Sequence, residues 1–335
     1  SNAATGLDDV HYHVLVPPEK IEEGLNLILE LLLFPKFEKE AFEMEKEVVL
    51  EEIAQNIEQP DEIIYMKLLK ECLTPHRYSK PILGNEKTVK SISPKQMKLF
   101  HKTHYVGKNC TLCIAGQLPH DIFSIINNSK LNELKSISKE KNINTKTTFN
   151  KGYKKETIPR LEGGRILKAW KLPPAKEQIL ILGAEIAATI LCEGKSSLIV
   201  KALREEKRII ESIDIDLQIL EKGGLILLDV SCQKKNLKIV ESEINKILKE
   251  LNRDLVTNKD LERAKRLVIN NIYFGLELST QIASTLGNQA LWGRHQSVLK
   301  SIEDISYWTT SRLNELIFPL FNPENAFTLI ALPEK

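Results

Sequence analysis

The stretch Phe42-Glu-Met-Glu-Lys-Glu-Val-Val-Leu-Glu-Glu-Ile53 lies inside a helical pattern that runs from about residue 38 to residue 57. Glu45 and Glu52 are seven residues apart, so the helix turns through about 700° between them and both carboxylates lie within about 20° of one face. Such a pair can act together on a metal ion or a substrate. The neighbouring residues are also acidic, however, and spacing alone favours a charged face in contact with solvent.

Hydrophobic periodicity extends the prediction to both sides of this helix. The order of strand, helices and strand recurs in the two halves of the chain. We therefore predict an α+β fold with two similar domains, each a mostly antiparallel sheet with helices packed on one face. The predicted strands are 9–16, 110–115, 165–172, 209–220, 225–232 and 327–331, and the predicted helices are about 21–32, 38–57, 62–72, 94–103, 177–191, 196–206, 235–252, 258–280 and 302–316.

A change of character separates the two halves. Residues 136–165 contain eight Lys or Arg against three Glu and few large apolar side chains. This composition favours a solvated linker over a binding patch. The predicted organisation is therefore a first domain at 1–135, a basic linker at 136–165 and a second domain at 166–335.

Composition excludes several classes of protein. The 47 Lys and Arg nearly balance the 45 Asp and Glu, so there is no electrostatic reason to expect nucleic acid or an anionic membrane as a partner. The longest apolar stretches, 25–34 and 179–192, are each interrupted by a Glu and are shorter than the ~18 residues of a membrane span. No secretory leader opens the chain, and five Cys form no disulfide framework, so we expect a reducing, cytoplasmic location.

Three short motifs could bind a metal, but each has a simpler interpretation. His101-x-x-His104 has helical spacing, yet no Glu accompanies it and the helix ends at once, which favours a solvated helix end. Cys110-x-x-Cys113 lies in a predicted strand, where residues three apart point to opposite faces. His11 and His13 share one face of a strand, either an exposed face or the lining of a groove, and two ligands without a nearby carboxylate or Cys make a weak site.

Several segments together resemble the pitrilysin/insulinase/mitochondrial-processing-peptidase family of zinc proteases. Residues 42–53 resemble its "ER-x-V-V-x-x-E-I" helix, and His76-Arg-Tyr-Ser-Lys-Pro-Ile-Leu-Gly84 resembles its "HPYG-x-P-x-x-G" loop. The resemblance runs in order from about residue 4 to residue 334. Further matches are the 92–116 segment, Gly194-Lys-Ser-Ser-Leu198, Leu203-Arg-Glu-Glu206 and Leu261-Glu-Arg-Ala-Lys265.

The resemblance implies two α+β domains that form one half of a clamshell, and it implies zinc-dependent cleavage of peptides. The family binds Zn²⁺ through two His of an inverted H-x-x-E-H motif, whose Glu activates a water, and through a Glu on a later helix. By residue match, Glu52 falls on this third ligand and Glu45 on a carboxylate that supports the metal site. Arg204, in the "LRE" match, falls on a residue that reaches the substrate.

The H-x-x-E-H motif itself is absent from the 335 residues, so no catalytic residue is assigned in this chain and no bound Zn²⁺ is expected in it. We expect the chain to start after the motif. Asn2-Ala3-Ala4-Thr5 resembles the "NA-x-T" segment that lines the family's substrate groove, which makes Asn2 and Ala3 candidate substrate-binding residues. Ser1-Asn2-Ala3 is equally typical of the remnant of a purification tag.

Two functions follow from the resemblance. The preferred one is a zinc metalloendopeptidase half that, in its full-length form, holds peptide substrates in a chamber shared with a second peptidase half, either another copy or a paired subunit. The alternative is a non-catalytic partner subunit that binds and shapes the substrate. The family often places a Tyr seven residues after the Arg of "LRE", where this chain has Glu211. This departure suggests that another half supplies the Arg/Tyr pair.

Overall fold

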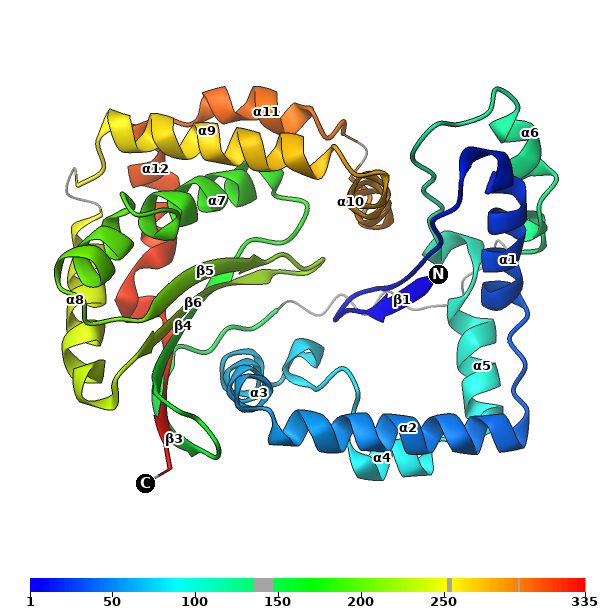
Figure 1. Ribbon diagram of the computed structural model, residues 1–335, viewed down its shortest axis with the longest axis horizontal. Coiled ribbons are helices and arrows are strands. Elements are labelled where there is room, and N and C mark those ends of the chain that lie inside the picture. Colours follow the sequence, from blue (N-terminus) through cyan, green and yellow to red (C-terminus); the bar gives the residue numbers. More distant parts are fainter. Residues whose placement is uncertain (135–146, 252–254, 295, 335) are drawn as a thin grey trace. The chain divides into compact units, whose positions relative to one another are not determined.

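The computed structural model describes residues 1–134, 147–251, 255–294 and 296–334. The chain divides into two compact units, each built from three segments (Figure 1). Unit 1 comprises Ser1–Ala54, Ile82–Asn144 and Phe274–His295, and unit 2 comprises Gln55–Pro81, Thr145–Tyr273 and Gln296–Lys335.

Unit 2 is built on a five-stranded sheet whose strands follow the order β3-β7-β4-β6-β5. The pairings β7–β4, β4–β6 and β6–β5 are antiparallel, and only β3 pairs with β7 in parallel. The predicted α+β class with a mostly antiparallel sheet is therefore confirmed. The strands are β3 (Gly152–Ile158), β4 (Gly164–Leu172), β5 (Ser212–Gln218), β6 (Gly224–Cys232) and β7 (Phe327–Pro333).

Alternation along the strands places the core on one side of this sheet. In β6, Ile226, Leu228 and Val230 are fully buried, whereas Leu227 and Asp229 point to the opposite face. The buried face packs under apolar helices that carry most of the core of unit 2 (Figure 1). These helices are α7 (Gln178–Cys192), the π-helix Val200–Glu206, α8 (Leu237–Glu250), α9 (Asn258–Gly275) and α12 (Thr310–Leu316). The short α11 (Lys300–Asp304) contacts α7 but has no buried residue.

The opposite face of the same sheet holds α3 (Pro60–Leu73), a helix from the N-terminal half of the chain. Arg165 on β4 donates from Nε to Asp229 Oδ1 at 2.9 Å and from Nη1 to Asp61 Oδ1 at 2.6 Å. This guanidinium therefore ties the first turn of α3 to the sheet. The prediction that helices cover one face only is thus incomplete, because sequence periodicity does not say which sheet a helix joins.

Unit 1 is mainly helical in the described part of the chain. Its sheet has two short antiparallel strands, β1 (Asn2–Thr5) and β2 (Val10–His13). Residues 110–115, predicted as a strand, belong to no helix and no described sheet, because a strand needs a hydrogen-bonding partner that local alternation does not supply. The helices are α1 (Ile21–Leu33), α2 (Lys39–Glu58, which continues into unit 2), α4 (Glu86–Ser91), α5 (Pro94–His104), α6 (Ile122–Asn127) and α10 (Ser279–Leu291).

The domain boundaries at 135 and 166 stay a prediction, and the compact units combine segments from both sides of them. The predicted linker contains β3, whose Lys154 and Glu156 form an ion-pair network with α3. The Lys67 Nζ to Glu156 Oε2 distance is 2.6 Å, and the Lys154 Nζ to Glu71 Oε1 distance is 2.8 Å. The basic residues of this part thus pair with the carboxylates of a helix distant in sequence. Residues 136–146 of the linker lie outside the described residues.

Two expectations from composition can be compared with the structure. All five cysteines are free thiols, and Cys72, Cys192 and Cys232 are buried. In the described ranges, the helices all lack the length and apolarity that a bilayer crossing requires.

The carboxyl group of Glu185, on α7, predicts a pH-dependent stability of unit 2. Burial, with a smaller effect of the Glu193 carboxylate, raises the pKa of Glu185 from 4.5 to about 7. The folded state therefore binds the proton more tightly than the unfolded state, so the free energy of unfolding falls as pH rises from about 4.5 to 7. We expect Glu185→Gln to stabilise unit 2 by about 1–3 kcal/mol at pH 8 and to have little effect at pH 4.

Urea unfolding of both proteins at pH 4 and pH 8 measures this difference directly. A Glu185→Gln variant that is equally or less stable than the parent at pH 8 would contradict the proposed cost of the buried charge.

Candidate functional site

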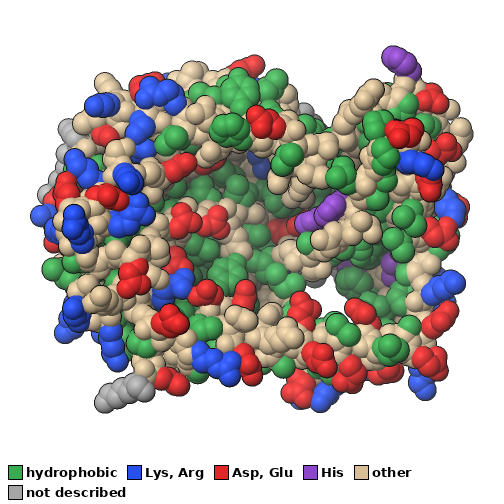
Figure 2. Space-filling model, viewed as in Figure 1, with side chains coloured by type: hydrophobic (Ala, Val, Ile, Leu, Met, Phe, Trp, Pro, Cys, Tyr) green, Lys and Arg blue, Asp and Glu red, His purple; other side chains and the backbone are tan. Residues whose placement is uncertain are grey.

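The two predicted carboxylates lie on an exposed face of α2. Glu45 and Glu52 are both exposed, and Val48, which lies within about 60° of both around the helix, is 56% exposed. Ile53, the buried residue of this helix, is rotated about 100° from Glu52. The surface along α2 and α4 is correspondingly rich in acidic side chains (Figure 2).

Lys46 holds a neighbouring face of α2 in place. Lys46 Nζ lies 3.0 Å from Glu43 Oε2 and donates to the carbonyl oxygen of Ile92, which follows α4, at 3.3 Å. Because Lys46 is one residue from Glu45, it is rotated about 100° away from it around the helix. The acidic face with Glu45 and Glu52 is therefore oriented by contacts of a residue about 100° away around α2.

The described residues do not complete a metal site. Within them, no three His, Cys, Asp or Glu side chains are grouped so that they could hold a metal ion. A catalytic zinc needs three protein ligands and one open position. Glu52 with Glu45 offers at most one ligand and its support, so these residues alone do not fit Zn²⁺ and no reaction step is derived through it.

The N-terminal hairpin presents the two candidate substrate-binding residues. Asn2 pairs with His13 and Ala3 with Tyr12, and the whole of β1 is exposed. On the Tyr12 face of the hairpin, the hydroxyl of Tyr12 lies 2.8 Å from the hydroxyl of Tyr105, which follows α5. This contact fixes the hairpin to the rest of unit 1. In the described sheet β1 pairs only with β2, so its second edge offers backbone N–H and C=O groups to an incoming chain.

The remaining candidate, Arg204, lies in unit 2. It is part of the π-helix Val200–Glu206, and its Nε donates to Glu205 Oε1 at 3.1 Å. Its side chain is 39% exposed, so it is accessible to a partner or substrate. Glu211, at the position where the family often has Tyr, is also exposed and begins a segment that leads directly into β5.

Of the other motifs considered as metal ligands, His101 has a structural role, and Cys110 and Cys113 belong to no metal-binding group in the described structure. His101 Nε2 lies 2.7 Å from the carbonyl oxygen of Leu32, and its ring stacks on Tyr105. It therefore joins the end of α5 to α1, in line with the helix-end interpretation. Cys110 and Cys113 lie outside any strand, so the argument from strand alternation fails for them, although no metal-binding group includes them in the described structure.

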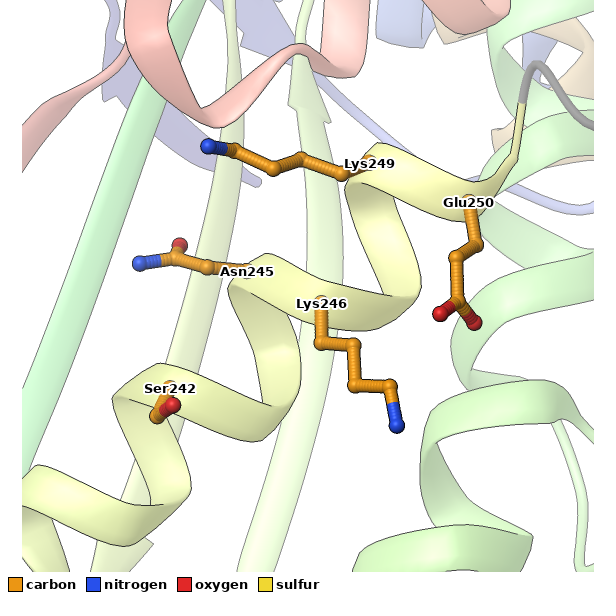
Figure 3. Close-up of a pocket in the computed structure, with 5 residues that line it drawn as sticks. All are labelled: Ser242, Asn245, Lys246, Lys249 and Glu250. Carbon is orange, nitrogen blue, oxygen red and sulfur yellow. The ribbon is translucent and has the colours of Figure 1, made fainter.

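Two cavities lie in unit 2, and none of the predicted site residues is among those that line them. One, of about 410 Å³, runs along α8, and its lining side chains point in different directions (Figure 3). The other, of about 470 Å³, lies between α3 and the sheet and is lined by carboxylates such as Asp214 and Asp216 around Arg165. The first cavity is lined by Ser242, Asn245, Lys246, Lys249 and Glu250.

Comparison with known proteins supplies the family. Residues 1–86 match the profile described as "Insulinase (Peptidase family M16)", and residues 91–268, more than half of the chain, match "Peptidase M16 inactive domain". The chain belongs to peptidase family M16. The first match includes the hairpin and the acidic face of α2, and the second includes Arg204.

M16 relatives resemble the chain over almost its whole length. The uncharacterized zinc protease YmxG of Bacillus subtilis is 24% identical, with 98% of this chain and 80% of the relative aligned. The uncharacterized zinc protease ML0855 of Mycobacterium leprae is 22% identical over 96% of this chain and 73% of its own length. Both names support Zn²⁺ as the metal of the family.

Solved structures confirm the fold. A protease from Helicobacter pylori superposes with a TM-score of 0.81 at 18% identity, over 94% of this chain and 78% of that protein. The peptidase M16 inactive domain from Pseudomonas fluorescens gives the same TM-score at 17% identity, over 95% of this chain and 76% of that protein. At these identities the likeness concerns the fold.

Sequence reasoning missed the contacts that hold the site residues. Tyr12 and Tyr105, which fix the hairpin, are 93 positions apart, and no local pattern connects them. The tyrosine in the middle of the short exposed strand could have indicated such a contact, because an aromatic side chain there needs a surface to pack on.

Proposed function

We propose that this M16 chain forms one half of a zinc metalloendopeptidase, with Glu52 as the third zinc ligand and Glu45 as the carboxylate that supports the metal site. The exposed face of α2 carries this proposal, because it presents both carboxylates, two turns apart, without a partner charge in the described residues. The two His ligands and the general-base Glu are proposed to come from residues outside these 335.

Peptide binding is proposed for the hairpin. An extended substrate would add as a strand to the second edge of β1, with Asn2 and Ala3 among the residues it meets. The small side chains of Ala3 and Ala4 support this proposal, since they leave room for a backbone to approach. Arg204, from unit 2, is the further proposed substrate contact.

A second peptidase half is part of the proposal. Because Glu211 replaces the family's Tyr, we assign the Arg/Tyr pair to another subunit, either a second copy or a different chain. Five free thiols support a reducing compartment, which we propose is the cytoplasm.

The non-catalytic alternative is favoured by one observation: no three-ligand group occurs in the described part of the chain. In that case a peptidase partner would do the cutting, and this chain would only shape the substrate chamber. The retained Glu45 and Glu52 favour the catalytic proposal, because a subunit without metal has no need of these carboxylates.

Zinc content tests the proposal. We expect the 335-residue chain to retain no stoichiometric Zn²⁺ after desalting and to show no chelator-sensitive peptide cleavage, because one carboxylate and its support hold Zn²⁺ weakly. The chain extended upstream to include an H-x-x-E-H helix should retain one Zn²⁺ and cleave a quenched peptide. Tight zinc and activity in the short chain, or neither in the extended one, would overturn the assignment of Glu52.

A further inference from the structure

The exposed face of the hairpin brings together two imidazoles that the proposed peptidase site does not use. His11 and His13 alternate with Tyr12 on β2, so both lie on the face opposite the Tyr12–Tyr105 contact. Their ring centroids are 6.2 Å apart, and the ring planes differ by 25°. The two side chains thus stand side by side on a strand whose position is fixed from its other face.

The cross-strand neighbours leave this face open. Ala4 lies opposite His11, and Asn2 lies opposite His13. Asn2 Oδ1 accepts a hydrogen bond from the backbone N–H of Ala3 at 2.8 Å, which turns its side chain toward its own strand. Both imidazoles are exposed, and 45% of the His11 side chain is accessible.

A carboxylate lies close to the ring of His11. Asp9 Oδ2 lies 3.7 Å from His11 Nδ1, and the Asp9 side chain is only 15% exposed. The backbone N–H of Gly6 donates to the carbonyl oxygen of Asp9 at 2.8 Å, so the loop between β1 and β2 holds this residue. In carboxylate–histidine–metal arrangements a carboxylate at hydrogen-bond distance from Nδ1 holds a proton there and leaves Nε2 as the lone-pair donor, and the Asp9 side chain lies on this side of the His11 ring.

We propose that His11 and His13 chelate a divalent transition metal, with Cu²⁺ bound more tightly than Ni²⁺ or Zn²⁺ and with water in the remaining positions. Two imidazole nitrogens that share one ion stand ~3 Å apart, since each lies ~2 Å from the metal. Rings 6.2 Å apart on neighbouring positions of one strand face reach this separation through side-chain rotation alone. Imidazole suits these ions, and their affinities follow the Irving–Williams order.

This proposal uses neither Glu45 nor Glu52, and it does not depend on the proposed peptidase activity. The proposed site has two protein ligands, so it does not conflict with the absence of three-ligand groups from the described residues. Such a site releases Zn²⁺ during desalting but is occupied at equilibrium by Cu²⁺.

Titration of the 335-residue chain with CuCl₂, followed by calorimetry and by the Cu²⁺ electron paramagnetic resonance spectrum, tests the proposal. We expect one Cu²⁺ per chain with nitrogen hyperfine structure from two imidazoles. His11→Gln and His13→Gln should each weaken binding at least tenfold, and Asp9→Asn should weaken it by up to about tenfold through the orientation of His11.

His120→Gln is the matched control, because His120 is exposed and lies in a different part of unit 1. It should bind Cu²⁺ like the parent. All four positions are at or near the surface, and circular dichroism verifies that each variant folds. Unchanged affinity in both His11→Gln and His13→Gln would overturn the proposal, and so would an equal loss in His120→Gln.

Discussion

Glu52→Gln, made in the chain extended upstream to carry the H-x-x-E-H helix, is expected to reduce turnover of a quenched peptide by more than about 100-fold. The amide keeps the volume of the side chain and the helix, but it removes the negative charge that offsets Zn²⁺ and completes the ligand set. Since Glu52 is exposed on α2, the substitution should leave the stability of unit 1 nearly unchanged. Bound zinc, measured in the same samples, should fall together with activity.

Two neighbouring carboxylates calibrate this result. Glu45→Gln should cost about 10–100-fold, as expected for a residue that acts on the metal through its ligands. Glu51→Gln is the matched control: Glu51 is also exposed, but it is rotated about 100° from Glu52 around the helix. Comparable losses for Glu51→Gln and Glu52→Gln would show that the register is wrong and that α2 carries only a charged surface.

Gly183→Ala is expected to destabilise unit 2 by about 3 kcal/mol or more. Gly183 is buried in the middle of α7, and a Cβ there would overlap Trp308 Cζ2 and lie 2.8 Å from Ile317 Cδ1. Trp308 and Ile317 are both fully buried, so neither can move without disturbing the core. The gain in helix propensity from Gly to Ala, about 1 kcal/mol, is too small to offset this overlap.

Gly275→Ala is the control, because it raises helix propensity without any steric overlap of the added Cβ. Gly275 ends α9, and no heavy atom outside its own helix segment lies within 4 Å of the added Cβ. We expect this variant to be as stable as the parent or slightly more stable. Urea unfolding followed by tryptophan fluorescence measures both effects, and soluble yield replaces it if Gly183→Ala fails to fold. Equal midpoints for the two variants would contradict the packing argument.

Sequence patterns predicted most elements because helices and amphipathic strands carry their own periodicity. The α2 pattern at 38–57 matches Lys39–Glu58, and the predicted strand at 225–232 matches β6. Predictions failed where a partner decides the structure. Residues 110–115 alternate like a strand but pair with nothing described, whereas β3, inside a basic stretch predicted as a linker, is held by pairing with β7 and by the carboxylates of α3.

The sequence by itself determined the register of α2, and therefore that Glu45 and Glu52 share one face, because 3.6 residues per turn is a local property of the backbone. It also contained the M16 resemblance, which the family profiles confirm. Only the tertiary structure decided that this face is exposed, that α3 joins the sheet of unit 2, and that the Tyr12–Tyr105 contact leaves His11 and His13 on the open side of the hairpin. These depend on contacts between residues far apart in the chain, whose energies no local pattern encodes.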